Sequence, residues 1–150
     1  MIIILVLFFI IFAIIGVNYF KGSFFSCRFG DQFPIHFIID RIVDTKYDCL
    51  NFGGAWINAD SNFDSVPEAM STLFQASTTE GWLDIMNNGI DSVAIDFEPN
   101  LNENMLWSLF FIVFVILANF LMLNLFAGVV VSTFNREKEI LDKNHLLSPN

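Results

Sequence analysis

The residues whose types and spacing could do chemistry form one short polar segment, Thr78-Thr79-Glu80-Gly81-Trp82. The segment directly follows an amphipathic stretch with helical spacing. The carbonyl end of a helix carries a partial negative charge, which favours a cation just beyond it, and Glu80 adds a carboxylate at that place. Gly81 permits a tight backbone corner, and the ring and N–H of Trp82 can hold the corner from behind. The segment is therefore a candidate part of an ion pathway.

The helix that would position this corner begins at Ser65. Ser65 and Glu68 have the spacing of a capping box, and Pro67 falls in the first turn. Four apolar residues then follow at helical spacing, and the pattern stops near Ser77. These residues are Val66, Met70, Leu73 and Phe74. Because the helix is too short to span a bilayer, it is re-entrant or lies outside, and a re-entrant helix requires a backbone buried in protein or facing water. A second short helix is expected to end near 88–89.

Two apolar segments flank this unit, which covers residues 65–91. Residues 1–20 are almost continuously apolar, and about 20 such residues make a helix of roughly 30 Å, one hydrocarbon core. A signal peptide is the alternative, but the run has no basic region and no small-x-small cleavage site follows it. Residues 105–135 form the second span, with no charge between Glu103 and Arg136. We predict an all-α membrane protein with two transmembrane helices flanking a re-entrant helix–corner–helix loop.

The loop at residues 21–64 is expected to be extracellular and contains both cysteines, Cys27 and Cys49. Two cysteines in an extracellular loop usually pair, so we predict a disulfide-bearing turret. Closing a loop of this size stabilises the fold by roughly 3 kcal/mol. A metal site is the alternative, but only His36 lies nearby and the spacing matches no zinc pattern.

Local structure within this loop is less clearly indicated. Residues 33–42 are compatible with a short strand or a short helix, and residues 51–56 read as a turn with Trp56 packed beneath the loop. The chain has no Asn-x-Ser/Thr sequon, so N-glycosylation is not expected. A second acidic loop, residues 92–104, returns the chain to the second span.

The charge distribution indicates the orientation in the membrane. The formal net charge is -9, and the acidic excess lies between the two spans. Such a surface gathers cations and would repel the phosphates of nucleic acid, which we exclude as a partner. The tail at residues 136–150 places basic residues beside the second span, which favours the cytosol for both termini.

Asn119 and Asn124 are the notable polar residues of the second span. Within a membrane such groups tend to face protein or water rather than lipid. The two do not share a helix face, whereas Asn124 and Gly128 do. A gating or cavity stripe is one interpretation. An interhelical hydrogen bond with close packing at Gly128 is the other, and spacing alone favours it.

Several blocks, taken in order, carry a resemblance to a known family. They are Gly-Val-Asn-Tyr-Phe-Lys-Gly (16–22), Asn-Phe-Asp-Ser-Val (62–66), Leu-Phe-Gln-Ala-Ser-Thr-Thr-Glu-Gly-Trp (73–82), Ile-Asp (90–91), Phe-Phe-Ile-Val-Phe-Val-Ile (110–116), Leu-Asn-Leu-Phe-Ala-Gly-Val-Val-Val (123–131) and Thr-Phe-Asn (133–135). Together with the two-cysteine loop, they resemble one pore repeat, most closely the third, of a four-repeat voltage-gated calcium or sodium channel, in the ion transport domain family. The resemblance covers nearly the whole chain except loop details between Phe29 and Trp56.

The resemblance implies a pore helix, a selectivity filter and a second helix between outer and inner transmembrane helices. Four repeats would place four filter side chains in a ring, and Glu80 matches one of them. Thr78 and Thr79 match residues whose backbone carbonyls line the filter, which Gly81 completes and Trp82 supports. The third repeat of animal sodium channels has Lys where this chain has Glu80. The family resemblance therefore implies conduction of Ca²⁺, or of Na⁺ and mixed cations, with Ca²⁺ bound only transiently and no cofactor.

The resemblance also implies roles and partners elsewhere. Asn124 matches an inner-helix Asn of the family, which makes Asn124 and Gly128 gating candidates. Other pore repeats of the same polypeptide, or other subunits, would complete the fourfold pore in the lipid bilayer, with room for auxiliary subunits. We expect a multi-pass protein of the plasma membrane. No helix with regularly spaced Arg is present, so we expect the chain to be a fragment of a longer protein rather than a short homotetrameric subunit.

Two other classes of protein are alternatives to a channel segment. A non-conducting two-span membrane adaptor with a disulfide-bonded ectodomain would explain the spans and cysteines, but not the short helix that ends at residues 78–82. An enzyme is not expected, because His36 and His145 lie on opposite sides of the predicted membrane and the sequence contains no evident nucleophile–base pair.

Overall fold

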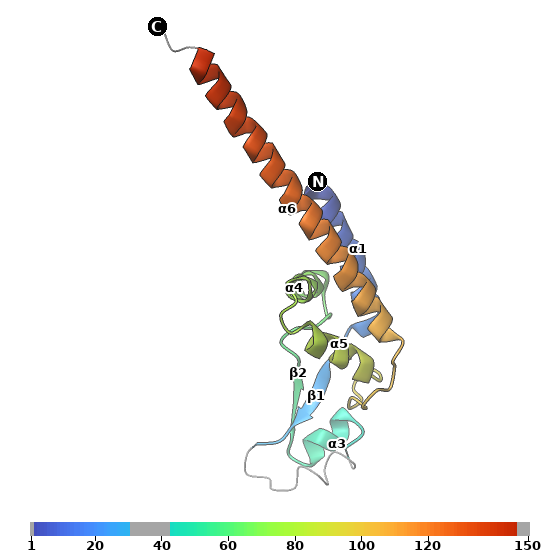
Figure 1. The fold of residues 1–150 in the computed structure, drawn as a ribbon. Helices are drawn as coiled ribbons and strands as arrows, with labels where there is room; N and C mark the ends of the chain where they lie inside the picture. The colour runs from blue at the N-terminus through green and yellow to red at the C-terminus, as the bar shows by residue number, and fades with distance from the viewer. Residues whose placement is uncertain (1, 31–42, 147–150) are drawn as a thin grey trace.

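The computed structural model describes residues 2–30 and 43–146, with side chains as far as residue 141. The segment 33–42, predicted as either strand or helix, lies outside the described residues. The elements, in order, are α1 (Ile2–Phe20), β1 (Phe25–Arg28), α3 (Lys46–Asn51), β2 (Ala55–Asn58), α4 (Val66–Ser77), α5 (Trp82–Asp91) and α6 (Trp107–Leu146). Figure 1 shows α1 alongside the first part of the much longer α6, the strands and α3 at the opposite end, and α4 and α5 between them.

Helices α1 and α6 are the two membrane-capable helices that the sequence predicts. Only 17% and 22% of their most apolar stretches are buried by the rest of the chain. A core helix of a soluble protein would be mostly covered, so this apolar surface is left for lipid or for other protein. The mostly helical fold with two such helices is therefore confirmed. Helix α6 continues beyond residue 135 to Leu146 without a break, because good helix formers such as Glu137, Lys138 and Glu139 follow the apolar stretch.

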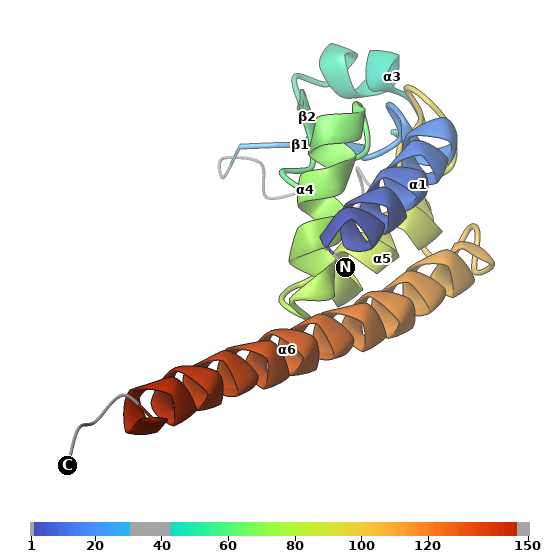
Figure 2. The same ribbon diagram turned by 90° about the horizontal axis from the view of Figure 1, so that it is seen from above.

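Helices α4 and α5 form the predicted helix–corner–helix unit. Helix α4 packs mainly against α1, and α5 packs mainly against α6. Figure 2 shows α4 beside α1, with α6 crossing below them. Helix α5 is longer than predicted and does not end near 88–89. Gly89 is instead a packing glycine, since a Cβ there would lie 2.5 Å from Cε2 of Phe111.

The loop at residues 21–64 contains a small sheet that the all-α prediction did not include. Strands β1 and β2 pair antiparallel, with Cys27 opposite Trp56. The predicted turn at 51–56 is correct only in its middle, because α3 includes Asn51 and β2 begins at Ala55. Gly53, at a φ of 79°, makes the turn between them.

The predicted disulfide joins β1 to α3. Cys27 and Cys49 are bonded, with their Cα atoms 5.7 Å apart, so both thiols that a metal site would need are consumed. Helix α3 begins with a capping box in which Thr45 and Asp48 each accept a hydrogen bond from the backbone N–H of the other. A Cβ on Gly54 would lie 2.6 Å from Sγ of Cys27. A glycine at this position is therefore what lets β2 pass over the disulfide.

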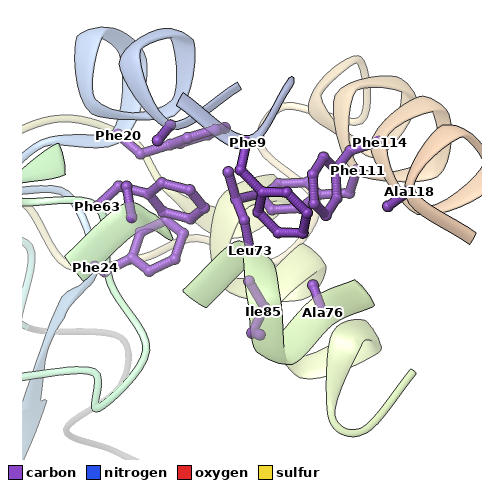
Figure 3. Close-up of a cluster of buried hydrophobic side chains, with 12 residues drawn as sticks. Phe9, Phe20, Phe24, Phe63, Leu73, Ala76, Ile85, Phe111, Phe114 and Ala118 are labelled. Atoms are coloured by element: carbon purple, nitrogen blue, oxygen red, sulfur yellow. The ribbon is translucent and has the colours of Figure 1, made fainter. Parts of the chain in front are cut away.

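Among the described residues, an aromatic-rich cluster holds α1, α4, α5 and α6 together. It draws residues from α1, α4, α5, α6 and the loop before α4, as Figure 3 shows. Its largest fully buried side chains include Phe20, Phe63, Phe111 and Phe114. Phe63 comes from the loop, and its ring centroid lies 5.4 Å from that of Phe20 and 6.1 Å from that of Phe111. The loop residue therefore contacts α1 and α6 at once.

We predict that Gly89→Ala destabilises the protein, because the added methyl group overlaps the ring of Phe111. Overpacking of this kind costs about 1–3 kcal/mol. The matched control is Gly30→Ala, since no atom of the described residues lies within 4 Å of a Cβ at Gly30. Thermal unfolding of both purified variants would measure the effect. Equal melting temperatures for the two variants would contradict the packing role of Gly89.

Candidate functional site

Helix α4 is fixed at its first turn by local signals. Ser65 has an extended backbone, and its side chain accepts a hydrogen bond from the backbone N–H of Glu68 at 3.4 Å. Pro67 lies in the first turn, as predicted. Ala69, Leu73 and three other residues of α4 are buried, so the direction of the helix is set by packing against α1.

The last turn of α4 satisfies its own carbonyl groups. The backbone N–H of Thr78 donates to the carbonyls of Phe74 and Gln75, and that of Thr79 donates to the carbonyl of Ala76 at 3.1 Å. The hydroxyl of Thr78 also donates to the carbonyl of Gln75 at 2.7 Å. These bonds use carbonyls that a helix end otherwise leaves without partners. The Thr78 hydroxyl is therefore engaged with its own helix.

The chain reverses between α4 and α5 through two residues with left-handed backbone. Thr79 has a φ of 63° and Gly81 a φ of 66°. Glycine adopts this conformation freely, as predicted for Gly81, whereas a β-branched residue such as Thr79 is strained there. The carbonyl of Gly81 then accepts the N–H groups of Asp84 and Ile85 and starts α5. Residues 78–80 join the two helices, and their carbonyls accept none of the backbone hydrogen bonds that form this turn.

Glu80 stands at the point where the ends of two helices meet. Its side chain is exposed, and it follows the carbonyl end of α4 and precedes the amino end of α5. The amino end of a helix favours negative charge, and α5 carries the further carboxylate of Asp84 in its first turn. Trp82 is half-buried and packs against the aromatic cluster. Thr78, Thr79, Glu80, Gly81 and Trp82 therefore form one corner, with the carboxylate outward and the indole inward.

Sequence reasoning did not single out Ser61 and Gln75, of which Gln75 lies against the corner and Ser61 contacts Gln75. The hydroxyl of Ser61 donates to Oε1 of Gln75 at 2.6 Å. Nε2 of Gln75 lies against Gly81, 3.5 Å from where a Cβ would be. The two residues are fourteen positions apart, so helical spacing gives no signal for the pair.

The inner-helix candidates lie away from the corner. Asn124 lines a groove of about 180 Å³ with residues from the first turns of α1. Gly128 lines a second groove, of about 510 Å³, between α6 and the start of α1. Both residues are exposed within the described chain. Asn119 instead donates from Nδ2 to the carbonyl of Val115 on its own helix, at 2.9 Å.

Comparison with known proteins adds independent evidence. The sequence profile of the family described as ion transport protein matches residues 1–142. The chain is 40% identical over 129 residues to the voltage-dependent T-type calcium channel subunit alpha-1G of Rattus norvegicus, which covers 86% of this chain and 5% of that protein. It is 38% identical over 139 residues to the sodium channel protein type 10 subunit alpha of Mus musculus, which covers 90% of this chain and 7% of that protein. It is 39% identical over 129 residues to the voltage-dependent T-type calcium channel subunit alpha-1I of Homo sapiens, which covers 86% of this chain and 5% of that protein.

The chain corresponds to a small part of each relative, and these relatives include both calcium and sodium channel subunits. The chain spans less than a tenth of the length of these relatives, 5% or 7% of each. Identity to a calcium channel subunit is 40% and to a sodium channel subunit 38%, so overall identity does not distinguish the two ions. Residues at the corner must therefore carry any argument about selectivity.

We predict that Thr79→Asn stabilises the protein. Asn tolerates left-handed backbone better than a β-branched residue, so the exchange removes strain of about 1 kcal/mol. Thr78→Asn is the control, because Thr78 has ordinary helical backbone with a φ of −77°. Thermal unfolding should show a melting temperature a few degrees higher for the first variant only. A lower melting temperature for Thr79→Asn would contradict the assignment of strain to this position.

Proposed function

The chain belongs to the ion transport protein family, and we propose that it is one pore-forming segment of a voltage-gated cation channel that conducts Ca²⁺, or Na⁺ and mixed cations. In this proposal α1 is the outer transmembrane helix and α6 the inner one. Residues 65–91 are the pore helices and selectivity filter, with Glu80 as one member of the filter ring. The corner between α4 and α5 carries the proposal, because a carboxylate and carbonyls outside the helical hydrogen bonding occur there in a short segment that lies, along the chain, between two membrane-capable helices.

The chemistry of the corner suits a hard cation. Ca²⁺ prefers several oxygen ligands, and Glu80 supplies carboxylate oxygens beside the carbonyls of residues 78–80. Carbonyl rings and carboxylate rings are the two devices by which cation channels replace part of an ion's hydration. Binding must remain loose enough for a following ion to displace the first. One carboxylate cannot enclose an ion, so other pore repeats of the same polypeptide, or other subunits, complete the ring.

The same proposal sets the orientation in the membrane. The turret at residues 21–64 and the return loop at 92–104 face the outside, where their acidic excess concentrates cations before the filter. Residues 105–135 cross the membrane as the inner helix, and residues 136–150 lie in the cytosol. The protein is then an integral, multi-pass protein of the plasma membrane, with auxiliary subunits as further candidate partners.

Asn124 and Gly128 are proposed to act at the level of the inner helix rather than at the filter. Each lines a groove against the start of α1. A polar side chain and a glycine one turn apart let α6 change its packing against α1 without a large steric penalty. This is consistent with a gating role, and it also accommodates the packing role that spacing alone favours.

We predict that Glu80→Gln reduces calcium current in the intact protein by at least about tenfold, since the charge of the filter ring falls while side-chain size is kept. Current carried by Na⁺ without external Ca²⁺ should remain. The control is Glu68→Gln, which removes the same charge from the opposite, exposed end of α4. Whole-cell recording with Ca²⁺ as the only external permeant cation measures the effect.

The outcomes of this experiment separate the competing interpretations. Unchanged calcium selectivity in Glu80→Gln would remove Glu80 from the ring. Equal loss in Glu68→Gln would indicate a general effect of surface charge. No current from the wild type, despite expression at the cell surface, would favour the non-conducting adaptor.

A further inference from the structure

The segment before α4, residues 59–64, runs alongside the pore helix and contacts it at two points. The carbonyl of Asn62 accepts the hydroxyl of Thr72 at 2.8 Å, and the hydroxyl of Ser61 donates to Oε1 of Gln75 at 2.6 Å. Thr72 and Gln75 are three residues apart and so share a face of α4. The second contact lies one turn closer to the corner than the first.

This segment is held firmly by its neighbours. Phe63 is fully buried in the aromatic cluster. Nδ2 of Asn62 donates to the carbonyl of Ala59 at 3.0 Å, and Oδ1 of Asn62 accepts the backbone N–H of Asp64 at 3.2 Å. Ser61 therefore extends from a braced loop rather than from a freely moving one, and its hydroxyl has a defined position relative to α4.

The orientation of the Gln75 amide follows from the contact with Ser61. A hydroxyl that donates to Oε1 fixes which side of the amide carries the oxygen, and the NH₂ group then lies on the other side. That group is the one placed against Gly81, 3.5 Å from a hypothetical Cβ. An amide donor is thereby presented to the corner whose carbonyls at residues 78–80 lie outside both helical ladders.

We propose that Ser61 and Gln75 are positioning residues for the selectivity filter, in which Ser61 of the outer loop orients the Gln75 amide and this amide sets the backbone shape of the corner that presents Glu80. The inference rests on the proposed function, because it concerns how the filter is held. The hydrogen bond between Ser61 and Gln75 is then the contact through which a change in the conformation of the loop alters the filter. Neither residue touches the ion in this arrangement.

The test compares four variants of the intact protein by the calcium concentration that half-blocks the sodium current. Ser61→Ala removes the donor and should raise this concentration by about two- to fivefold, the range expected for one solvent-accessible hydrogen bond. Ser61→Thr keeps the hydroxyl and should restore the wild-type value. Gln75→Glu replaces the NH₂ donor with an oxygen and should shift the block more than Ser61→Ala does.

Thr72→Val is the matched control. It removes the neighbouring contact between the same loop and the same helix, but one turn away from the corner. It should lower thermal stability without moving the half-blocking concentration. An equal shift of the half-blocking concentration in Thr72→Val and Ser61→Ala would mean that the Ser61 contact only stabilises the fold. That result would overturn the inference.

The remaining outcomes are distinguishable from failure of the proposed function. If the wild-type current depends on Glu80 but calcium half-blocks the sodium current of Ser61→Ala at the wild-type concentration, the inference is wrong and the proposed function stands. If Ser61→Thr fails to restore the wild-type value, the hydroxyl is not the active group and the inference is again wrong. If the wild type carries no Glu80-dependent current, both proposals fail together.

Discussion

The burial of Phe63 is the contact on which the arrangement of this chain depends. Its side chain has 0% exposure, and a Cβ on Gly16 would lie 2.5 Å from its ring. Within a bilayer, apolar burial gives no strong preference for protein over lipid, so helices associate through close packing and small residues. The approach of Phe63 to Gly16 is such a contact. Because Ser65 caps α4 two residues later, the position of this ring also fixes where α4 starts and which way it runs.

The corner at the end of α4 depends on that placement but is shaped by the backbone. Local hydrogen bonds satisfy the last carbonyls of α4, and Gly81 allows α5 to begin immediately afterwards. The carbonyls of residues 78–80 accept none of the backbone hydrogen bonds that form this turn, and the side chain of Glu80 beside them is exposed. A strained residue, Thr79, persists here because the helices on both sides over-determine the turn. Strain of this kind is maintained by tertiary packing, which leads back to the aromatic cluster.

The sequence predicts well whatever is determined locally. Capping residues and apolar spacing located α4 to within a residue, and the compartment argument paired Cys27 with Cys49. Prediction from the sequence fails where a contact between residues far apart in the chain determines the local structure. Gly89 looked like a helix end because Gly commonly terminates helices, yet Phe111 packs against it. The pairing of β1 with β2 depends on Gly54 passing over the disulfide, and no local pattern signals that. The Ser61–Gln75 pair is likewise a product of the fold.

The loop at residues 21–64 and the return loop at 92–104 are linked to each other, and they flank the helices on the two sides of the corner. The return loop at 92–104 is tied to it, since Oε2 of Glu98 accepts the backbone N–H of Cys27 at 2.9 Å and the backbone N–H of Lys46 donates to the carbonyl of Asp96 at 2.9 Å. The ion pair between the same Lys46 and Asp96 side chains is 3.2 Å long but about half exposed, and exposed pairs of this kind contribute little. Backbone pairing and the disulfide therefore fix the arrangement of the two loops. Since the turret leads into α4 and the return loop leaves α5, a rigid link between them limits how far the two helices can separate.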